Sequence, residues 1–86
     1  MEKITVIVPV YNVDPFLERA LKSLTEQTYT NLQILLIDDG STDKSGEICE
    51  EWSKKDERIQ CVHQENSGVS AARNHGLDLA EGSYIM

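Results

Sequence analysis

The sequence predicts an α/β protein in which a parallel sheet lies between two layers of helices, a three-layer α/β/α sandwich. Strand-like runs begin near Lys3, Leu32, Arg58 and Ser83, and a segment with helical spacing lies between each successive pair. This alternation is typical of right-handed crossovers that build a parallel sheet. The second run is apolar at every position of residues 34–37, which indicates a strand covered by helices on both faces.

The chain has 86 residues, which is short for a domain. A chain of this length buries only about 60–65% of its unfolded surface, so we expect residues 1–86 to form one compact unit. Residues 83–86 have the pattern of another buried strand. We therefore expect the chain to be part of a longer protein, with the sheet truncated in its fourth strand.

Composition and charge limit the classes of partner. The sequence is 40% hydrophobic, and its apolar runs are far shorter than the ~20 residues of a membrane span. The first eight residues lack the apolar core of a secretory signal, so we expect a cytoplasmic protein, at most peripheral to a membrane in its full-length form. The formal net charge of -7 argues against a nucleic acid polymer as partner. A small phosphorylated ligand needs only helix amino ends, one arginine and a divalent metal.

Capping signals and apolar stripes predict the first two helices. The first helix is predicted to have Asp14 as its N-cap, to have Pro15 at its first position and to end near Gln27. Residues 41–43 are predicted to begin the second helix. The apolar face of the first helix comprises Phe16, Leu17, Ala20, Leu21 and Leu24, and that of the second comprises Ile48, Cys49 and Trp52.

The third helix is predicted to begin after Gly68 and to end before Gly82, which suits a left-handed cap. Its apolar stripe comprises Val69, Ala72, Gly76 and Leu79.

Cysteine and histidine residues give no metal motif at the level of sequence. Cys49 and Cys61 match neither a paired-thiol motif nor a zinc spacing, so we expect buried free thiols. His63 and His75 have no partner at metal-ligand spacing, and we interpret both as structural or surface residues.

Polar residues follow the first two strands at the same edge of the predicted sheet. Pro9 lacks a backbone donor and ends the first strand, so Val10, Tyr11 and Asn12 form a loop beside the Asp38-Asp39 pair. An aromatic ring and an amide suit a planar ligand such as a base. The alternative is a turn in which Asn12 binds local backbone groups and Tyr11 packs on the domain.

The two carboxylates also allow two interpretations. Asp39 avoids repelling a phosphate if it accepts an N–H from a base or a hydroxyl from a ribose, while Asp38 orients the loop or caps a turn. Alternatively, both acids only cap a helix. The free amides at the start of the third helix favour a phosphate oxygen, and Arg73 lies about one and a half turns further along; alone, it is equally compatible with a solvated helix residue.

Three segments carry a resemblance to a known family: ITVIVPVYN, SLTEQTYTNLQILLIDDGSTD and NSGVSAARNHGLDLAEGSYI. They resemble the amino-terminal half of the nucleotide-binding domain of family-2 glycosyltransferases, and the resemblance spans essentially the whole chain. It implies a GT-A fold, of which this chain is a Rossmann-like half. It also implies binding of a nucleoside-diphosphate sugar, commonly a UDP-sugar, and transfer of the sugar with inversion to a saccharide or lipid-linked acceptor in polysaccharide biosynthesis.

The resemblance also implies roles for individual residues. Tyr11 lies near the uracil ring, Asp39 accepts its imide N–H, Asp38 supports that loop, and Arg73 approaches the nucleotide or diphosphate. The base site is lined by Pro9, Val10, Tyr11 and Asn12, and the third helix is shaped by Asn66, Gly68, Asn74 and Gly76.

The chain departs from the family in two respects. Gln33 stands where many relatives have Glu. More importantly, the Asp-x-Asp motif that holds Mn²⁺ or Mg²⁺ in the family and its later catalytic carboxylate are not in these residues. Inverting transfer needs a general base and charge neutralisation on the leaving diphosphate. We therefore assign no catalytic residue and no metal ligand, and expect nucleotide recognition without turnover from these residues alone.

Three other classes of protein share part of this pattern. A dinucleotide-binding module needs a glycine-rich turn after the first strand, where this chain has Pro9 to Pro15. A phosphorylation-dependent receiver-like signalling domain has its acid pair after the first strand and an acceptor Asp after the third, which here ends at His63. A non-catalytic interaction module pairs through the exposed edge of the fourth strand, and self-association through that edge is expected.

Overall fold

The structure is a computed structural model that describes residues 3–26, 31–82 and 84–85. Its elements are β1 (Ile4–Val10), α1 (Asp14–Thr25), β2 (Leu32–Asp39), α2 (Ser45–Lys55), β3 (Ile59–Gln64), α3 (Val69–Leu79) and β4 (Tyr84–Ile85). The predicted alternation of strands and helices is confirmed. The predicted helix end at Gln27 and strand start at Ser83 lie outside the described residues.

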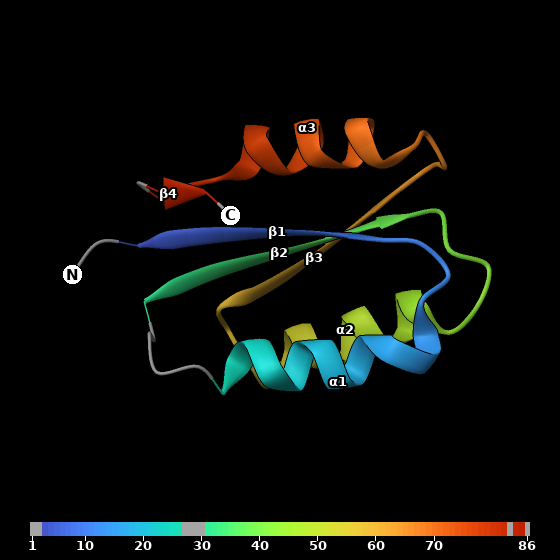
Figure 1. Cartoon of the computed structure of the whole chain (residues 1–86), viewed down its shortest axis with the longest axis horizontal. Helices are drawn as coiled ribbons and strands as arrows, with labels where there is room; N and C mark the ends of the chain where they lie inside the picture. Colours follow the sequence, from blue (N-terminus) through green and yellow to red (C-terminus); the bar gives the residue numbers. More distant parts are fainter. Residues whose placement is uncertain (1–2, 27–30, 83, 86) are drawn as a thin grey trace.

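The four strands form one parallel sheet in the order β3-β2-β1-β4. Figure 1 shows α1 and α2 on one face of this sheet and α3 on the other. Right-handed crossovers explain the arrangement, because the connections from β1 to β2 and from β2 to β3 step in one direction, whereas the connection to β4 returns across the sheet. The predicted three-layer α/β/α sandwich is confirmed.

The central strand β2 carries the core, because all eight of its residues are buried. Successive side chains of a strand point to opposite faces of the sheet. Ile34 and Leu36 lie in the apolar cluster beneath α1 and α2. Leu35 and Ile37 lie in a second cluster, beneath α3. The continuous apolar run in the sequence therefore reflects burial on both faces.

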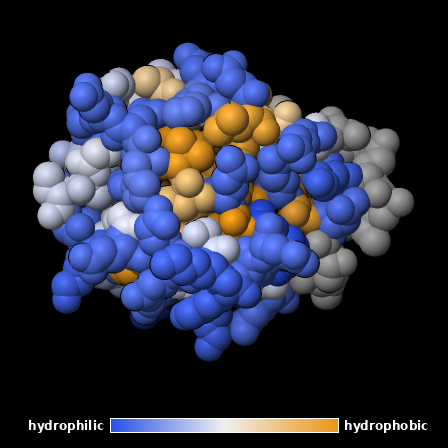
Figure 2. Space-filling view, turned by 180° about the vertical axis from the view of Figure 1, so that it is seen from behind, coloured by the Kyte–Doolittle hydropathy of each residue, from blue (hydrophilic) through white to orange (hydrophobic). Residues whose placement is uncertain are grey.

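The outer surface is largely hydrophilic, as the net charge suggests. Figure 2 shows the molecule from behind, on the side of the edge strand β3, with hydrophilic residues over most of the face and hydrophobic residues gathered near its centre. Phe16, Ala20 and Val69, all predicted on buried helix faces, are exposed, Phe16 by 69% and Val69 by 55%. These three predictions are wrong because each of these helices buries a narrower face than its apolar residues span.

The prediction that Asp14 caps its own helix is wrong. Val13 takes the N-cap position of α1, and Asp14 Oδ2 accepts the N–H of Lys44, the N-cap residue of α2, at 3.2 Å. In return, Asp43 Oδ2 accepts the N–H of Asp14 at 3.1 Å, and Asp43 Oδ1 accepts the N–H of Ser45 at 2.9 Å. The starts of α1 and α2 therefore satisfy each other, and α2 begins at Ser45, later than the sequence predicts.

The prediction of a left-handed cap at Gly82 is also wrong. The described glycines with positive φ are Gly40 and Gly68. The N–H of Gly82 donates to Thr5 Oγ1 at 2.8 Å, and a Cβ at Gly82 would lie 2.7 Å from the Thr5 nitrogen. Close approach to β1, and not a left-handed backbone, is therefore what requires glycine here.

Candidate functional site

A pocket opens at the carboxyl ends of β1 and β2. The loop after β1 turns to the face that carries α1, whereas the loop after β3 turns to the opposite face and leads into α3. Ligands bind in the crevice where loops of an open α/β sheet diverge in this way. The cavity has a volume of about 420 Å³, within the range of roughly 300–1,000 Å³ typical of small-molecule sites. Its lining residues are Pro9, Val10, Tyr11, Val13, Asp39, Asn66, Gly68 and Val69.

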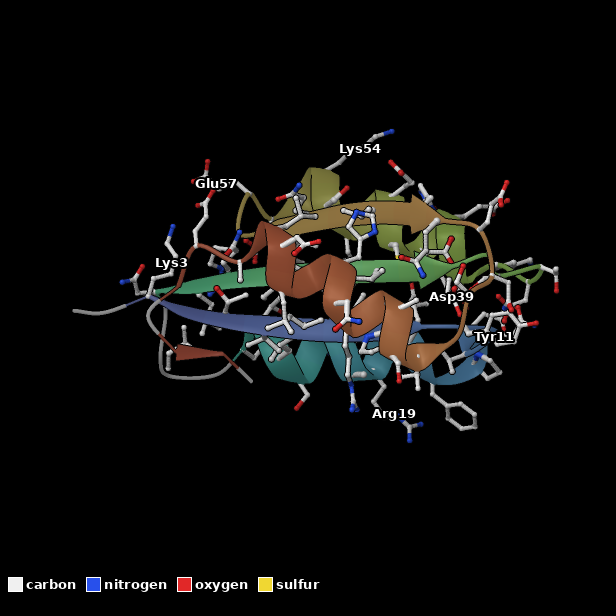
Figure 3. The ribbon with its side chains drawn as sticks, turned by 90° about the horizontal axis from the view of Figure 1, so that it is seen from above. Lys3, Tyr11, Arg19, Asp39, Lys54 and Glu57 are labelled. Carbon is white, nitrogen blue, oxygen red and sulfur yellow. The ribbon has the colours of Figure 1, made fainter. Side chains whose placement is uncertain are left out.

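Tyr11 and Asp39 share this pocket because β1 and β2 are paired in register. Val10 lies opposite Asp38, so the residues that follow them, Tyr11 and Asp39, lie at the same edge of the sheet. Figure 3 shows Tyr11 and Asp39 at one end of the sheet, with Lys3 and Glu57 at the other. Tyr11 is 49% exposed and offers an aromatic surface to the cavity.

Asp39 is buried and already accepts three hydrogen bonds. Its Oδ1 accepts from Gln64 Nε2 at 2.9 Å and from the N–H of Ser67 at 2.7 Å, and its Oδ2 accepts from the N–H of Gly68 at 3.0 Å. These bonds, that from Gln64 foremost, hold the pKa of Asp39 below its ordinary value. A carboxylate accepts about four hydrogen bonds, so Asp39 has room for about one more donor, on Oδ2.

The start of α3 differs from the sequence-based expectation. The amides of Ser67 and Gly68 donate to Asp39, and are therefore not available to a phosphate. Gly68 has a φ of 95°, which favours glycine, and a Cβ there would meet no atom within 4 Å. Asn66 Nδ2 donates to the carbonyl oxygen of Asp39 at 3.1 Å. The loop before α3 is thus built around the end of β2.

Asn12 holds the loop after β1 and is not among the residues that line the cavity. Its Oδ1 accepts from the N–H of Thr42 at 2.8 Å and from that of Asp43 at 3.3 Å, and its own N–H donates to Ser41 Oγ at 3.1 Å. Its φ of 50° lies in the left-handed region that Asn tolerates. Asn12 therefore binds backbone groups, as the alternative interpretation proposed, but these groups belong to the loop after β2 and are not local to Asn12.

Asp38 and Arg73 also lie outside the cavity lining. Asp38 is 5% exposed, and its Oδ1 accepts from the N–H of Ser41 at 3.1 Å, which holds the loop after β2. Arg73 and Asn74 are exposed on α3, while Gly76 is buried against β1. The structure thus brings together Tyr11 and Asp39 but does not add Arg73 to them.

Val13 and Val69 line the cavity and were not predicted as site residues. Both carry only apolar side chains, so no chemical group in the sequence marked them as site residues. The exposure of Val69 directly after the glycine at the start of α3 is the feature that marks it.

His63 also has a role that the sequence did not indicate. Its Nδ1 lies 2.7 Å from Asp38 Oδ2 and its Nε2 lies 2.6 Å from Glu50 Oε1. Hydrogen bonds to Asp38 and then to Glu50 raise the pKa of His63 from 6.5 to about 9. The pairing of β2 with β3 places His63 opposite Asp38, and that register is the signal that was missed.

The pocket does not fit a catalytic Mn²⁺ or Mg²⁺. Among the described residues that line it, Asp39 is the one carboxylate, and both of its oxygens are already hydrogen-bonded to the protein. These ions take several oxygen ligands.

Comparisons with solved structures support the GT-A fold. A mannosyltransferase from Pyrobaculum calidifontis, in complex with GDP-Man and Mn²⁺, is 30% identical with a TM-score of 0.89; the match covers 98% of this chain and 26% of that one. TarS of S. aureus, residues 1–349 in complex with UDP, is 31% identical with a TM-score of 0.88, and the match again covers 98% of this chain and 26% of that one.

Sequence comparisons lead to the same family. Glycosyltransferase GlyA of Streptococcus pneumoniae is 56% identical over 84 residues, which are 98% of this chain and 12% of the relative. The chain thus spans a small part of the proteins it matches. No helix in the described part of the chain is long and apolar enough to cross a membrane. The family model for glycosyl transferase family 2 matches residues 5–86. The chain therefore belongs to glycosyltransferase family 2.

Proposed function

We propose that this chain is the donor-nucleotide-binding part of a glycosyltransferase that uses a nucleoside-diphosphate sugar, with a UDP-sugar favoured. The observation that carries the proposal is the pairing of Tyr11 and Asp39 in one cavity at the carboxyl edge of the sheet. The base packs on the ring of Tyr11 and donates an N–H to the remaining acceptor position of Asp39. Two similar structures are complexes with GDP-Man and with UDP, which supports a nucleotide ligand.

The hydrogen-bonding capacity of Asp39 favours uracil over guanine. Uracil presents one imide N–H between two carbonyl groups, whereas guanine presents an imide N–H next to an amino group and so offers two neighbouring donors. Asp39 Oδ1 already accepts two hydrogen bonds and Oδ2 accepts one. A ligand with a single donor therefore matches the free position on Oδ2 better than a ligand with two.

Asp39 is not the general base of the transfer. A base works best with a pKa near the working pH, but hydrogen bonds lower the pKa of Asp39 below its ordinary value of 3.8. We therefore assign Asp39 to binding, and propose that the base and the ligands of Mn²⁺ or Mg²⁺ belong to other parts of the full-length enzyme. Inversion, a saccharide or lipid-linked acceptor, a contact of Arg73 with the diphosphate, and a cytoplasmic location stay predictions.

Titration calorimetry with nucleotides tests this proposal. The full chain is titrated with UDP, GDP, CDP and ADP at one salt concentration. UDP is expected to bind at least about tenfold more tightly than GDP, a difference of about 1.4 kcal/mol, because guanine leaves one donor without an acceptor. Equal affinities for all four nucleotides would contradict the assignment of Asp39 to base recognition.

A further inference from the structure

Glu50, Cys61 and His63 form a cluster apart from the nucleotide pocket. Cys61 and His63 are two positions apart on β3, so their side chains lie on the same face of the strand, and Glu50 reaches them from α2. Their ligand atoms, a carboxylate oxygen, Sγ and an imidazole nitrogen, all lie within 4.8 Å of one another. None of these three residues is among those that line the pocket.

We propose that Glu50, Cys61 and His63 bind a Zn²⁺ ion. Carboxylate oxygen, thiolate sulfur and imidazole nitrogen are the three kinds of ligand that zinc takes in proteins. Three protein ligands leave the fourth tetrahedral position to a water molecule. Sulfur and nitrogen ligands together favour zinc over Mg²⁺ or Ca²⁺, which prefer oxygen.

The distance between the sulfur and nitrogen ligands agrees with tetrahedral zinc, whereas the carboxylate lies too close to the imidazole and has to move. Zn–N bonds of about 2.0–2.1 Å and Zn–S bonds of about 2.3 Å separate the two ligand atoms by about 3.6 Å. Cys61 Sγ and His63 Nε2 are 3.5 Å apart. Glu50 Oε1 lies 2.6 Å from His63 Nε2, closer than the roughly 3.3 Å of a tetrahedral N and O pair. The Glu50 side chain is 48% exposed, so it is free to move outward by the difference.

Asp38 orients His63 for this role. Its Oδ2 lies 2.7 Å from His63 Nδ1, and Asp38 itself is 5% exposed and bound to the N–H of Ser41. A histidine that binds a metal usually donates its other ring N–H to a carboxylate or carbonyl, which fixes the ring and its tautomer. With Nδ1–H donated to Asp38, the lone pair of His63 Nε2 points toward Cys61 and Glu50. A buried carboxylate behind the ring is therefore an observation independent of the three ligands.

Such a site would tie α2 to β3. It would also hold Asp38, the neighbour of Asp39 at the end of β2, so zinc would stabilise the sheet edge on which the pocket is built. The alternative is a metal-free cluster in which a protonated His63 bridges Asp38 and Glu50.

Metal titration of the full chain tests the zinc site. After treatment with a chelator and a thiol reductant, the chain is titrated with Co²⁺ alone and then with Zn²⁺ alone. We expect one Co²⁺ per chain, with the strong visible bands of tetrahedral cobalt and a thiolate charge-transfer band in the near ultraviolet, and displacement by one Zn²⁺. Absence of bound metal, or octahedral cobalt without the thiolate band, would overturn the proposal.

Matched variants separate this site from general metal binding. Loss of an outer hydrogen-bond partner costs metal sites about 10–100-fold in affinity, so loss of a ligand in Cys61→Ser or His63→Gln is expected to cost at least as much. Glu50→Gln is a third ligand variant, in which an amide replaces the carboxylate on an exposed side chain. The controls are His75→Gln and Glu51→Gln, which remove the same groups from outside the cluster and are expected to bind as the wild type does. Equal affinity in Cys61→Ser and the controls would overturn the proposal, and circular dichroism checks that each variant is folded.

Discussion

At the residue scale, Asp39 joins the end of β2 to the start of α3. It is buried at the edge of the sheet and binds Gln64, Ser67 and Gly68 while it also lines the cavity. The sequence placed an acid at this edge, because the apolar run ends there. It did not show that the acid is already engaged, because the partners lie 25 to 29 residues further along the chain.

Acid is expected to loosen the start of α3 through Asp39. The pKa of Asp39 is lower in the folded chain than its ordinary value of 3.8, so its stabilising effect is complete above that value and is lost as pH falls through the folded pKa. Melting temperatures between pH 5 and pH 2.5 are expected to fall more steeply in the wild type than in Asp39→Asn. The control Asp78→Asn changes an exposed acid of α3 and is expected to follow the wild type. Parallel curves for all three proteins would contradict this account.

His63 is expected to act in the opposite direction. Its pKa rises from 6.5 to about 9 on folding, so the stabilisation is complete below about pH 6.5 and is lost as pH rises through 9. The side chain is 46% exposed, so solvent screening limits the effect to about 1 kcal/mol or less. Urea unfolding in the presence of a chelator measures it. His63→Gln is expected to flatten the dependence between pH 6.5 and 9, whereas His75→Gln retains it; a flat wild-type profile would contradict the ion pair.

At the element scale, the starts of α1 and α2 show that capping rules for a single helix do not predict hydrogen bonds between two helices. Asp14 precedes a proline and has the local pattern of an N-cap, yet it binds Lys44, and Asp43 binds Asp14. Capping rules consider one helix at a time, whereas these bonds join residues about thirty positions apart. These hydrogen bonds connect the loop after β1 to the loop after β2. They therefore hold the backbone next to Tyr11 in position.

Gly76 tests how closely α3 packs on β1. Gly76 is buried on the side of α3 that faces the sheet. A Cβ at this position would lie 2.6 Å from Ile7 Cγ2. Alanine normally favours a helix by about 1 kcal/mol over glycine, but overpacking costs about 1–3 kcal/mol. We expect Gly76→Ala to lower the free energy of unfolding by up to about 2 kcal/mol in denaturant titrations. In an Ile7→Ala background, which lacks Cγ2, the same Gly76→Ala change is expected to cost less; a more stable Gly76→Ala single variant would contradict this packing.

At the scale of the whole molecule, the fold class follows from general rules. Consecutive apolar positions require a strand covered on both faces, and right-handed crossovers then fix which helices share a face. The same rules predict that Tyr11 and Asp39 meet at one edge. They do not predict which apolar helix residues stay exposed. Phe16 and Val69 are exposed whereas Leu17 and Ala72 are buried, and this difference depends on how each helix is positioned over the sheet.

Self-association through the edge of the fourth strand stays a prediction. β3 and β4 are the two edge strands of the sheet. The pairing of β4 with β1 is described for two residues, Tyr84 and Ile85. Light scattering as a function of concentration measures whether the chain associates.

The most direct test of the central claim is the affinity of the full chain for UDP with and without the ring of Tyr11. Stacking of a base on an aromatic side chain is worth about 1–3 kcal/mol, so Tyr11→Ala is expected to weaken UDP binding by about tenfold or more in titration calorimetry. The matched control is Phe16→Ala, which removes an exposed ring of α1 that does not line the cavity and is expected to leave the affinity unchanged. UDP affinity that is the same in Tyr11→Ala, Phe16→Ala and the wild type would contradict the account.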